Sequence, residues 1–160
     1  MRKIIPLIVF YLFFSVQLFA NTFYVTTASD SINGSLKHLA GIAFSGDTIR
    51  FNTNIDSVNI SNSSIPIDKN LTIIGGFAKT KISGFNTRLF VVMPGKTLNL
   101  ISLILQNGDN NPWAALEGGA AIYNQGILYL NSCIVKKNIG INAYQTFGGA
   151  IHNSNGTITI

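Results

Sequence analysis

The sequence predicts an all-β protein folded as a right-handed parallel β-helix, a solenoid in which each coil stacks on the one before it. Three observations lead to this fold class. The composition favours strands and tight turns, because 18 of the 160 residues are asparagine, 15 are glycine and only 11% are charged. A Gly-Gly-Ala motif at 118–120 recurs at 148–150, which indicates an internal repeat. Short apolar segments alternate with period two, which is typical of strands.

The segment 1–20 is typical of a secretory signal peptide. Arg2 and Lys3 form a positive end, an apolar run extends from 4 to 19, and Ala20 offers a small residue for cleavage. A membrane anchor is the alternative, but Gln17 and the polar segment after Ala20 end the run early. We therefore expect a signal peptide over 1–20, an N-terminal cap over 21–46 and β-helix coils over 47–160.

The cap combines a strand-like segment over 22–27 with a short helix over 35–43. Ser35 is suited to the N-cap position of this helix. One helical face then carries Leu36, Leu39, Ala40 and Ala43. We expect this face to cover the first coil, because a solenoid exposes an apolar column at each end. His38 is expected on the surface.

The coils are predicted from short strands that recur along the chain, each alternating inward and outward side chains. Residues 98–105 overlay 128–135 without a gap. Two inward columns are expected, one of Ile49, Leu71, Leu98, Leu128 and Ile158 and one of Phe51, Ile73, Leu100, Leu130 and Ile160. The residues between them face outward, namely Arg50, Thr72, Asn99, Tyr129 and Thr159. A β-sandwich is the alternative fold, but its loops would not need to repeat at fixed spacings.

The repeats also assign structural roles to glycine and asparagine. The pairs Gly118-Gly119 and Gly148-Gly149 permit positive φ and close backbone approach at a corner. Asn124 and Asn153 lie at the following bend, where stacked amides hydrogen-bond from coil to coil. Because Ile160 lies inside a strand that begins a new circuit, we expect the chain to be C-terminally incomplete and part of a longer protein.

Residues able to carry chemistry are few. The acidic residues are Asp30, Asp47, Asp56, Asp68, Asp109 and Glu117. Only Asp109 and Glu117 share a segment, the insertion over 107–118 that also holds Trp113. These three residues are the candidate ligand-binding set: the tryptophan either stacks on a sugar ring or packs over the coil, and Asp109 is a weak candidate for calcium. We predict no catalytic residue, no metal site and no cofactor.

The single cysteine, Cys133, excludes an intramolecular disulfide and is expected to be buried. Neither His38 nor His152 has acidic or cysteine partners at zinc-ligand spacing. Of the net charge of +5, two positive charges belong to the leader, and the remaining nine basic and six acidic residues give +3. So weak and dispersed a charge argues against nucleic acid as a partner.

Three segments carry a resemblance to a known group of proteins. Asp47-Thr48-Ile49-Arg50-Phe51, the segment 69–75 and Gly148-Gly149-Ala150-Ile151 resemble secreted right-handed β-helix proteins of Gram-negative bacteria, above all the chlamydial polymorphic outer membrane proteins. Similar repeats occur in large surface proteins of Bacteroidetes. Repeats of this family carry Gly-Gly-Ala-Ile-type and Phe-x-x-Asn tetrapeptides. The chain departs from this pattern in two places: Ala121 is inserted after the first Gly-Gly-Ala, and 135–138 lacks the leading phenylalanine.

This resemblance implies a secreted or cell-surface protein of a Gram-negative bacterium, in the outer membrane and acting as an adhesin. Its partner would be a host cell, a neighbouring cell or a glycan, and it would contact a membrane only through a C-terminal anchor outside this chain. The alternative functions are a carbohydrate-active enzyme of the pectate-lyase-like β-helix type and a glycan-binding module. Fold alone does not separate them.

Overall fold

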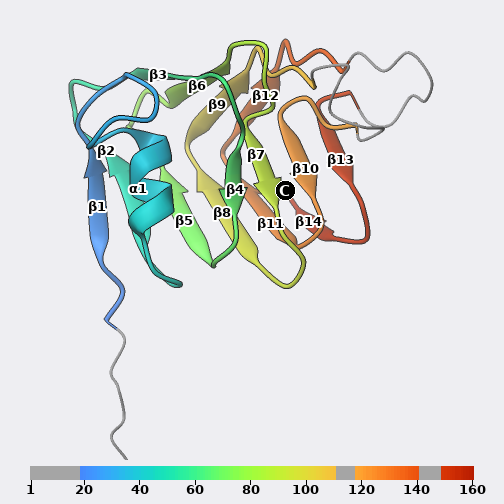
Figure 1. Ribbon diagram of the computed structural model, residues 1–160, viewed down its shortest axis with the longest axis horizontal. Helices are drawn as coiled ribbons and strands as arrows, with labels where there is room; N and C mark the ends of the chain where they lie inside the picture. The colour runs from blue at the N-terminus through green and yellow to red at the C-terminus, as the bar shows by residue number, and fades with distance from the viewer. Residues whose placement is uncertain (1–18, 111–117, 141–148) are drawn as a thin grey trace, which may run out of the picture.

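The protein is a right-handed parallel β-helix, as the sequence predicts (Figure 1). The computed structural model describes residues 19–110, 118–140 and 149–160. Over these residues one short helix accompanies 14 strands, and every strand pair is parallel. Positions 1–18 of the predicted signal peptide lie outside the described part of the chain.

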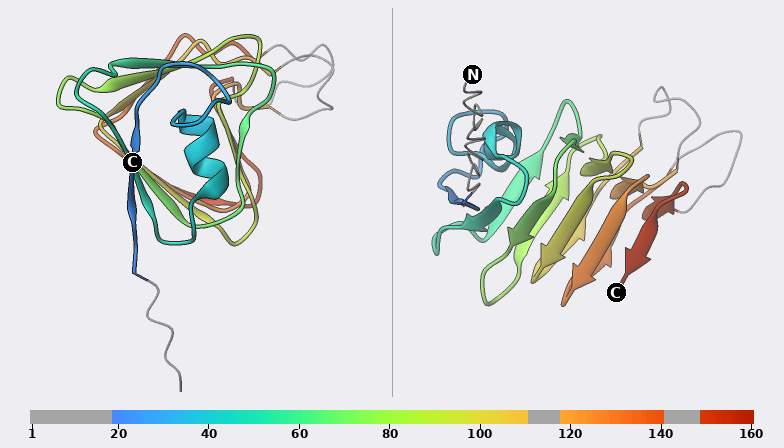
Figure 2. Two further views of the ribbon diagram at one scale, coloured as in Figure 1. Left: turned by 60° about the vertical axis from the view of Figure 1, so that its left-hand side comes forward. Right: turned by 90° about the horizontal axis from the view of Figure 1, so that it is seen from below.

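The strands form three sheets that run along the solenoid. Sheet A, in spatial order, contains β1 (Thr22–Val25), β2 (Thr48–Phe51), β5 (Leu71–Ile74), β8 (Thr97–Ile101), β11 (Ile127–Asn131) and β14 (Thr157–Thr159). Sheet B contains β3 (Ser57–Ile60), β6 (Thr80–Gly84), β9 (Leu103–Gln106) and β12 (Ile134–Lys136). Sheet C contains β4 (Ile65–Ile67), β7 (Phe90–Val92), β10 (Ile122–Asn124) and β13 (Ile151–Asn153). Each coil visits the sheets in the order A, B, C and then returns to A one rung higher (Figure 2).

The corners between sheets are built from residues in the left-handed backbone region. A single residue, Ser102, separates β8 from β9 and has φ 54°. Ser132, with φ 53°, lies at the equivalent corner one coil later, where it and Cys133 separate β11 from β12. After sheet B the chain turns again at Asn107 and Lys137, with φ 53° and 54°. Asparagine adopts this region more readily than most residues, and lysine does so at a cost of about 1–2 kcal/mol.

The inward columns are confirmed in most coils, with two corrections. Ile160, expected to face inward, lies beyond β14 and is 94% exposed. The other correction concerns register. Leu71, Leu98, Leu128 and Ile158 are paired in successive strands, as are Ile73, Leu100 and Leu130. In the first coil, however, Ile49 pairs with Ile73 rather than with Leu71. The alignment expected for these two strands is therefore wrong by one inward-facing position, and Phe51 lies beyond the paired stretch.

Asp47 explains the difference in register. It takes the place next to Leu71 that aliphatic residues occupy in later coils, and it is 1% exposed. Its Oδ1 accepts a hydrogen bond from the Asn21 amide and its Oδ2 one from the Phe44 amide, both at 2.7 Å. At this end of the stack the carboxylate satisfies loop amides, so an apolar residue would leave them without partners.

The predicted cap helix is present as α1 (Leu36–Ile42) and contacts β1, β2 and β4 at the end of the core (Figure 2, left). Ser35 is the N-cap, and its hydroxyl accepts a hydrogen bond from the His38 amide at 3.2 Å. His38 itself is half-buried rather than on the surface. At the other end of α1, the ammonium of Lys69 donates to the carbonyls of Ala40 at 3.3 Å and Gly41 at 3.1 Å. A cation at this C-terminal end also interacts favourably with the negative end of the helix dipole.

A second contact ties the cap loop to the first coil. Asp30 Oδ2 accepts hydrogen bonds from Lys37 Nζ at 3.1 Å and from the amide and hydroxyl of Ser61 at 3.0 and 2.9 Å. Burial raises the pKa of Asp30, but the hydrogen bonds from Lys37 and Ser61 outweigh it, so the pKa lies below its ordinary value of 3.8. The ionised carboxylate therefore stabilises the cap.

Candidate functional site

The predicted ligand-binding residues are only partly within the described chain. Asp109 follows β9 at the corner between sheets B and C, where it forms an isolated parallel bridge with Ile139. Its amide donates to the Thr87 carbonyl at 3.0 Å, and its Oδ1 is buried with no hydrogen-bond partner among the described residues. Trp113 and Glu117 lie outside the described residues. The structure therefore places one member of the predicted set, Asp109, at this corner.

Two described residues that lie far apart along the chain, Asn110 and Gly140, come together at this corner. The segments 111–117 and 141–148, both outside the described residues, follow Asn110 and Gly140 at the same corner of successive coils. A Cβ on Gly140 would lie 3.6 Å from Asn110 Oδ1, so the two departure points are neighbours. Asn110 and Gly140 stand one full coil apart along the chain, and this spacing is the signal in the sequence that indicates their proximity.

The predicted glycine and asparagine positions lie at the ends of the sheet C strands. Gly119 has φ 81°, and a Cβ there would lie 2.2 Å from the Ile122 carbonyl oxygen. Gly149 has open space around its Cβ position, and Gly148 lies outside the described residues. The Asn124 amide nitrogen donates to Asn153 Oδ1 at 2.7 Å, which links successive coils.

Arg88, which the sequence reasoning did not single out, organises the corner below these glycines. It is 9% exposed. Its Nε donates to the Gly119 carbonyl at 2.8 Å and its Nη2 to the Gly118 carbonyl at 3.0 Å. The guanidinium also lies over the Tyr123 ring, 5.2 Å from its centroid, and Tyr123 meets His152 edge-on at 5.3 Å. Arg88 and Gly118 are one coil apart along the chain, so coiling brings them together.

A polar hollow of about 230 Å³ lies at this corner. It is lined by Asn62, Ser63, Ser64, Asn86, Thr87, Arg88, Asp109 and Asn110. Most of these residues carry a hydroxyl or an amide group, so the hollow offers partners for hydrogen bonding. Of the chain that the structure describes, no part gathers three or more histidine, cysteine, aspartate or glutamate side chains at metal-binding distance.

The outer face of sheet A is the second candidate, and it is continuous over six strands. Pairing aligns Thr22, Thr48, Thr72, Asn99, Tyr129 and Thr159 in one outward row. Thr72, Asn99, Tyr129 and Thr159 are the outward residues that the sequence predicts. We call the part of this face formed by Asn70, Thr72, Thr97, Asn99, Tyr129 and Thr159 the Tyr129 face.

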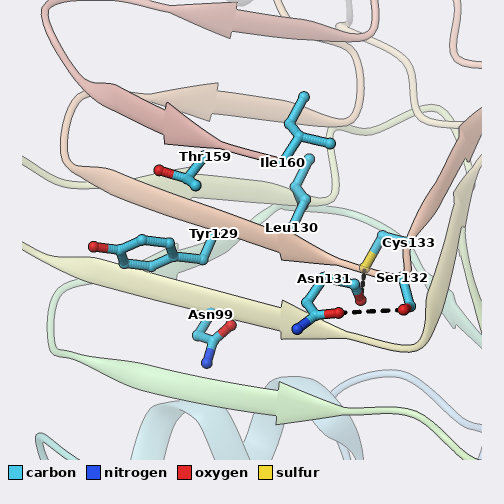
Figure 3. A pocket seen from close by; sticks show the side chains of 8 residues that line it. All are labelled: Asn99, Tyr129, Leu130, Asn131, Ser132, Cys133, Thr159 and Ile160. Atoms are coloured by element: carbon cyan, nitrogen blue, oxygen red, sulfur yellow. Dashed lines mark hydrogen bonds between the residues drawn. The ribbon is translucent and has the colours of Figure 1, made fainter.

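Tyr129 stands between two hollows on this face. Tyr129 is 42% exposed, and Figure 3 shows its ring extended beside Asn99 and Thr159. One hollow, of about 180 Å³, is lined by Gly46, Asn70, Leu71, Thr72, Thr97, Asn99 and Tyr129. Within it Asn70 Oδ1 accepts a hydrogen bond from the Thr97 amide at 2.9 Å, which holds these two residues of the lining together.

The other hollow is larger, about 840 Å³, and reaches around the edge of β11 (Figure 3). It is lined by Asn99, Tyr129, Leu130, Asn131, Ser132, Cys133, Thr159 and Ile160. Whereas β8 pairs with β11 as far as Asn131, β14 pairs with it only as far as Tyr129. Part of this hollow is therefore formed by the edge of β11 that β14 leaves unpaired beyond Tyr129. Only the outer side of the hollow belongs to the Tyr129 face.

Cys133 lies half-buried at the end of the larger hollow. Its Sγ lies 3.4 Å from the Leu100 carbonyl oxygen. Burial raises the pKa of the Cys133 thiol above its ordinary value, although Lys79 and nearby backbone groups oppose this. The thiol is consequently protonated at neutral pH and a poor nucleophile.

Comparison with protein-family models, with curated proteins and with solved structures finds no match for this chain. In the described residues there is also no helix with the length and apolarity needed to cross a bilayer. The candidate sites are therefore judged on their geometry.

Proposed function

We propose that this chain is a non-catalytic, adhesin-like interaction domain that works outside the cell or on the surface of a Gram-negative bacterium. The observation that carries the proposal is the Tyr129 face, a continuous outer surface with an exposed aromatic ring among amides and hydroxyls. Location and the adhesin-like role also draw on the resemblance of the repeats to bacterial surface β-helix proteins. The pectate-lyase-like enzyme of the sequence analysis stays an untested alternative.

The architecture supports binding over an extended surface. A solenoid repeats one structural unit, so outward side chains form straight rows on a rigid support. Exposed tyrosines contribute strongly to binding surfaces, because a large ring with a polar tip loses little conformational entropy on binding. Leu128 and Leu130, on either side of Tyr129 in β11, are 0% and 6% exposed and hold the strand in place.

Binding of the exported chain to intact cells tests this proposal. The chain is isolated in the processed form that its own bacterium produces and is then labelled. It is incubated with cells of the bacterium's host and with bacterial cells of other species. We expect saturable binding to at least one surface, weakened about thirtyfold by Tyr129→Ala, since an anchoring aromatic residue contributes on the order of 2 kcal/mol.

The matched control is Phe77→Ala. Phe77 is fully exposed in the turn between β5 and β6, outside the Tyr129 face, so its loss removes an aromatic ring without touching the proposed surface. Equal binding by Tyr129→Ala and the unmodified chain, or the absence of saturable binding to any surface, would contradict the proposal.

A further inference from the structure

We propose that the Tyr129 face binds a neutral polysaccharide, whose chain lies along the outward row of sheet A with one sugar ring stacked on Tyr129. This inference rests on the proposed function and names the chemical class of its partner. It differs from the sequence analysis, in which the aromatic candidate was Trp113, a residue expected either to stack on a sugar ring or to pack over the coil.

The side chains of the Tyr129 face match the chemistry of a sugar. A pyranose ring presents an apolar C–H surface and a rim of hydroxyl groups. The exposed Tyr129 ring offers a flat apolar surface and a hydroxyl at its tip. Its direct neighbours in the row are Asn99 on β8 and Thr159 on β14. An asparagine amide both donates and accepts, so it can bond two adjacent sugar hydroxyls, and threonine supplies a further donor and acceptor.

The charge of the face favours a neutral ligand over an acidic one. Of the described residues that line the two hollows beside Tyr129, none is charged. Arg50 is on the same sheet but in the neighbouring outward row, where it pairs with Tyr24 and Ile74. An acidic polysaccharide would be held through several cations facing its carboxylates or sulfates, and its binding would weaken steeply with salt.

The length and direction of the row favour a polymer. Strands in a sheet are separated by about 4.8 Å, so six rungs place the first and last outward residues roughly 24 Å apart. The row is straight, because all pairs in it are parallel and in register. Hydroxyl or amide side chains at five of its six positions can therefore contact successive sugars of one extended chain.

The test measures binding to soluble polysaccharides and to a cell surface in parallel. Dextran, galactomannan, xylan and laminarin are the neutral probes, and alginate and polygalacturonate are the acidic ones. The cell surface that binds the chain is divided into samples treated with periodate, which cleaves vicinal diols, or with protease. Variants Tyr129→Ala, Tyr129→Phe and Phe77→Ala are compared with the unmodified chain.

We expect at least one neutral polymer to bind with little dependence on salt, and cell binding to be lost after periodate but kept after protease. Tyr129→Ala should weaken binding at least tenfold, Tyr129→Phe less than threefold because the ring remains, and Phe77→Ala not at all. The proposal is overturned if only acidic polymers bind, if no neutral polymer binds, or if protease rather than periodate abolishes cell binding. In that last case the proposed adhesin-like function stands with a protein partner, whereas the absence of saturable binding to any untreated cell surface refutes the function itself.

Discussion

Asn124 should contribute more to stability than any other polar side chain at the corner between sheets C and A. Its side chain is 0% exposed. The amide nitrogen donates to Asn153 Oδ1 at 2.7 Å, to the Thr157 carbonyl at 3.1 Å and to the Gly126 carbonyl at 3.3 Å. Its Oδ1 accepts from the Gly126 amide at 3.2 Å. One side chain therefore joins two coils and closes its own turn.

The size of the effect follows from which groups lose their partners in Asn124→Ala. The amide of Gly126 belongs to a buried residue, and an unsatisfied buried donor costs about 1–3 kcal/mol. The carbonyl of Thr157 and the side-chain oxygen Oδ1 of Asn153 belong to exposed residues that water can reach, so each lost hydrogen bond there costs about 0.5–1 kcal/mol. We expect a loss of about 2–5 kcal/mol in the free energy of unfolding.

The matched control is Asn153→Ala, in the same ladder one coil later. Asn153 is exposed, and its removal leaves Asn124 with two carbonyl acceptors, so the loss should be about 1 kcal/mol. Urea unfolding followed by circular dichroism gives both values. Hydrogen exchange of β13 and β14 shows whether the last coil opens separately, since solenoids can unfold coil by coil. Equal losses for the two variants, or a loss below about 1 kcal/mol for Asn124→Ala, would refute the ladder as a main source of stability.

Three further predictions concern backbone conformation and charge. Gly119→Ala should cost at least about 2 kcal/mol, because its Cβ would lie 2.2 Å from a carbonyl oxygen at φ 81°, whereas Gly149→Ala, with open space, should change the unfolding free energy by less than about 0.5 kcal/mol. Lys137→Asn should stabilise the chain by about 0.5–1 kcal/mol through relief of its φ of 54°, and Lys137→Ala should not, both measured by urea unfolding. Because the folded pKa of Asp30 is lowered, its contribution is present above pH 3.8 and is lost as the pH falls through the folded value, so Asp30→Asn should flatten the acid side of the stability–pH curve.

The sequence predicts the fold well where each coil repeats the pattern of the last. Leu98 to Leu105 and Leu128 to Val135 align without gaps, and their strands pair in that register. The same reasoning misplaced Ile49, because it aligned the first aliphatic residue of β2 with the first aliphatic residue of β5, Leu71. At the end of a stack the inward position can serve the loops instead of the core, and there Asp47 displaces the expected aliphatic residue.

The candidate site was less predictable for a physical reason. Sequence inspection favours unusual residues in insertions, and so it selected Asp109, Trp113 and Glu117. It placed Tyr129 facing outward but gave it no functional role, because the value of the position comes from Asn99 and Thr159, which are distant in sequence and adjacent only after coiling. Arg88 was missed for the same reason, since its partners Gly118 and Gly119 lie a full coil further along the chain.

The division between inward and outward positions makes the function of Tyr129 separable from its stability. The core of β11 is formed by Leu128 and Leu130, so Tyr129→Ala removes only cross-strand contacts on the outer face, and the free energy of unfolding should fall by less than about 1 kcal/mol. Leu128→Ala, at the adjacent and fully buried position, should cost about 2–5 kcal/mol in the same urea titration. If Tyr129→Ala instead destabilises the chain as much as Leu128→Ala, the ring is part of the core. A loss of binding in that variant would then report unfolding rather than a lost contact, and the Tyr129 face would no longer be supported as a binding surface.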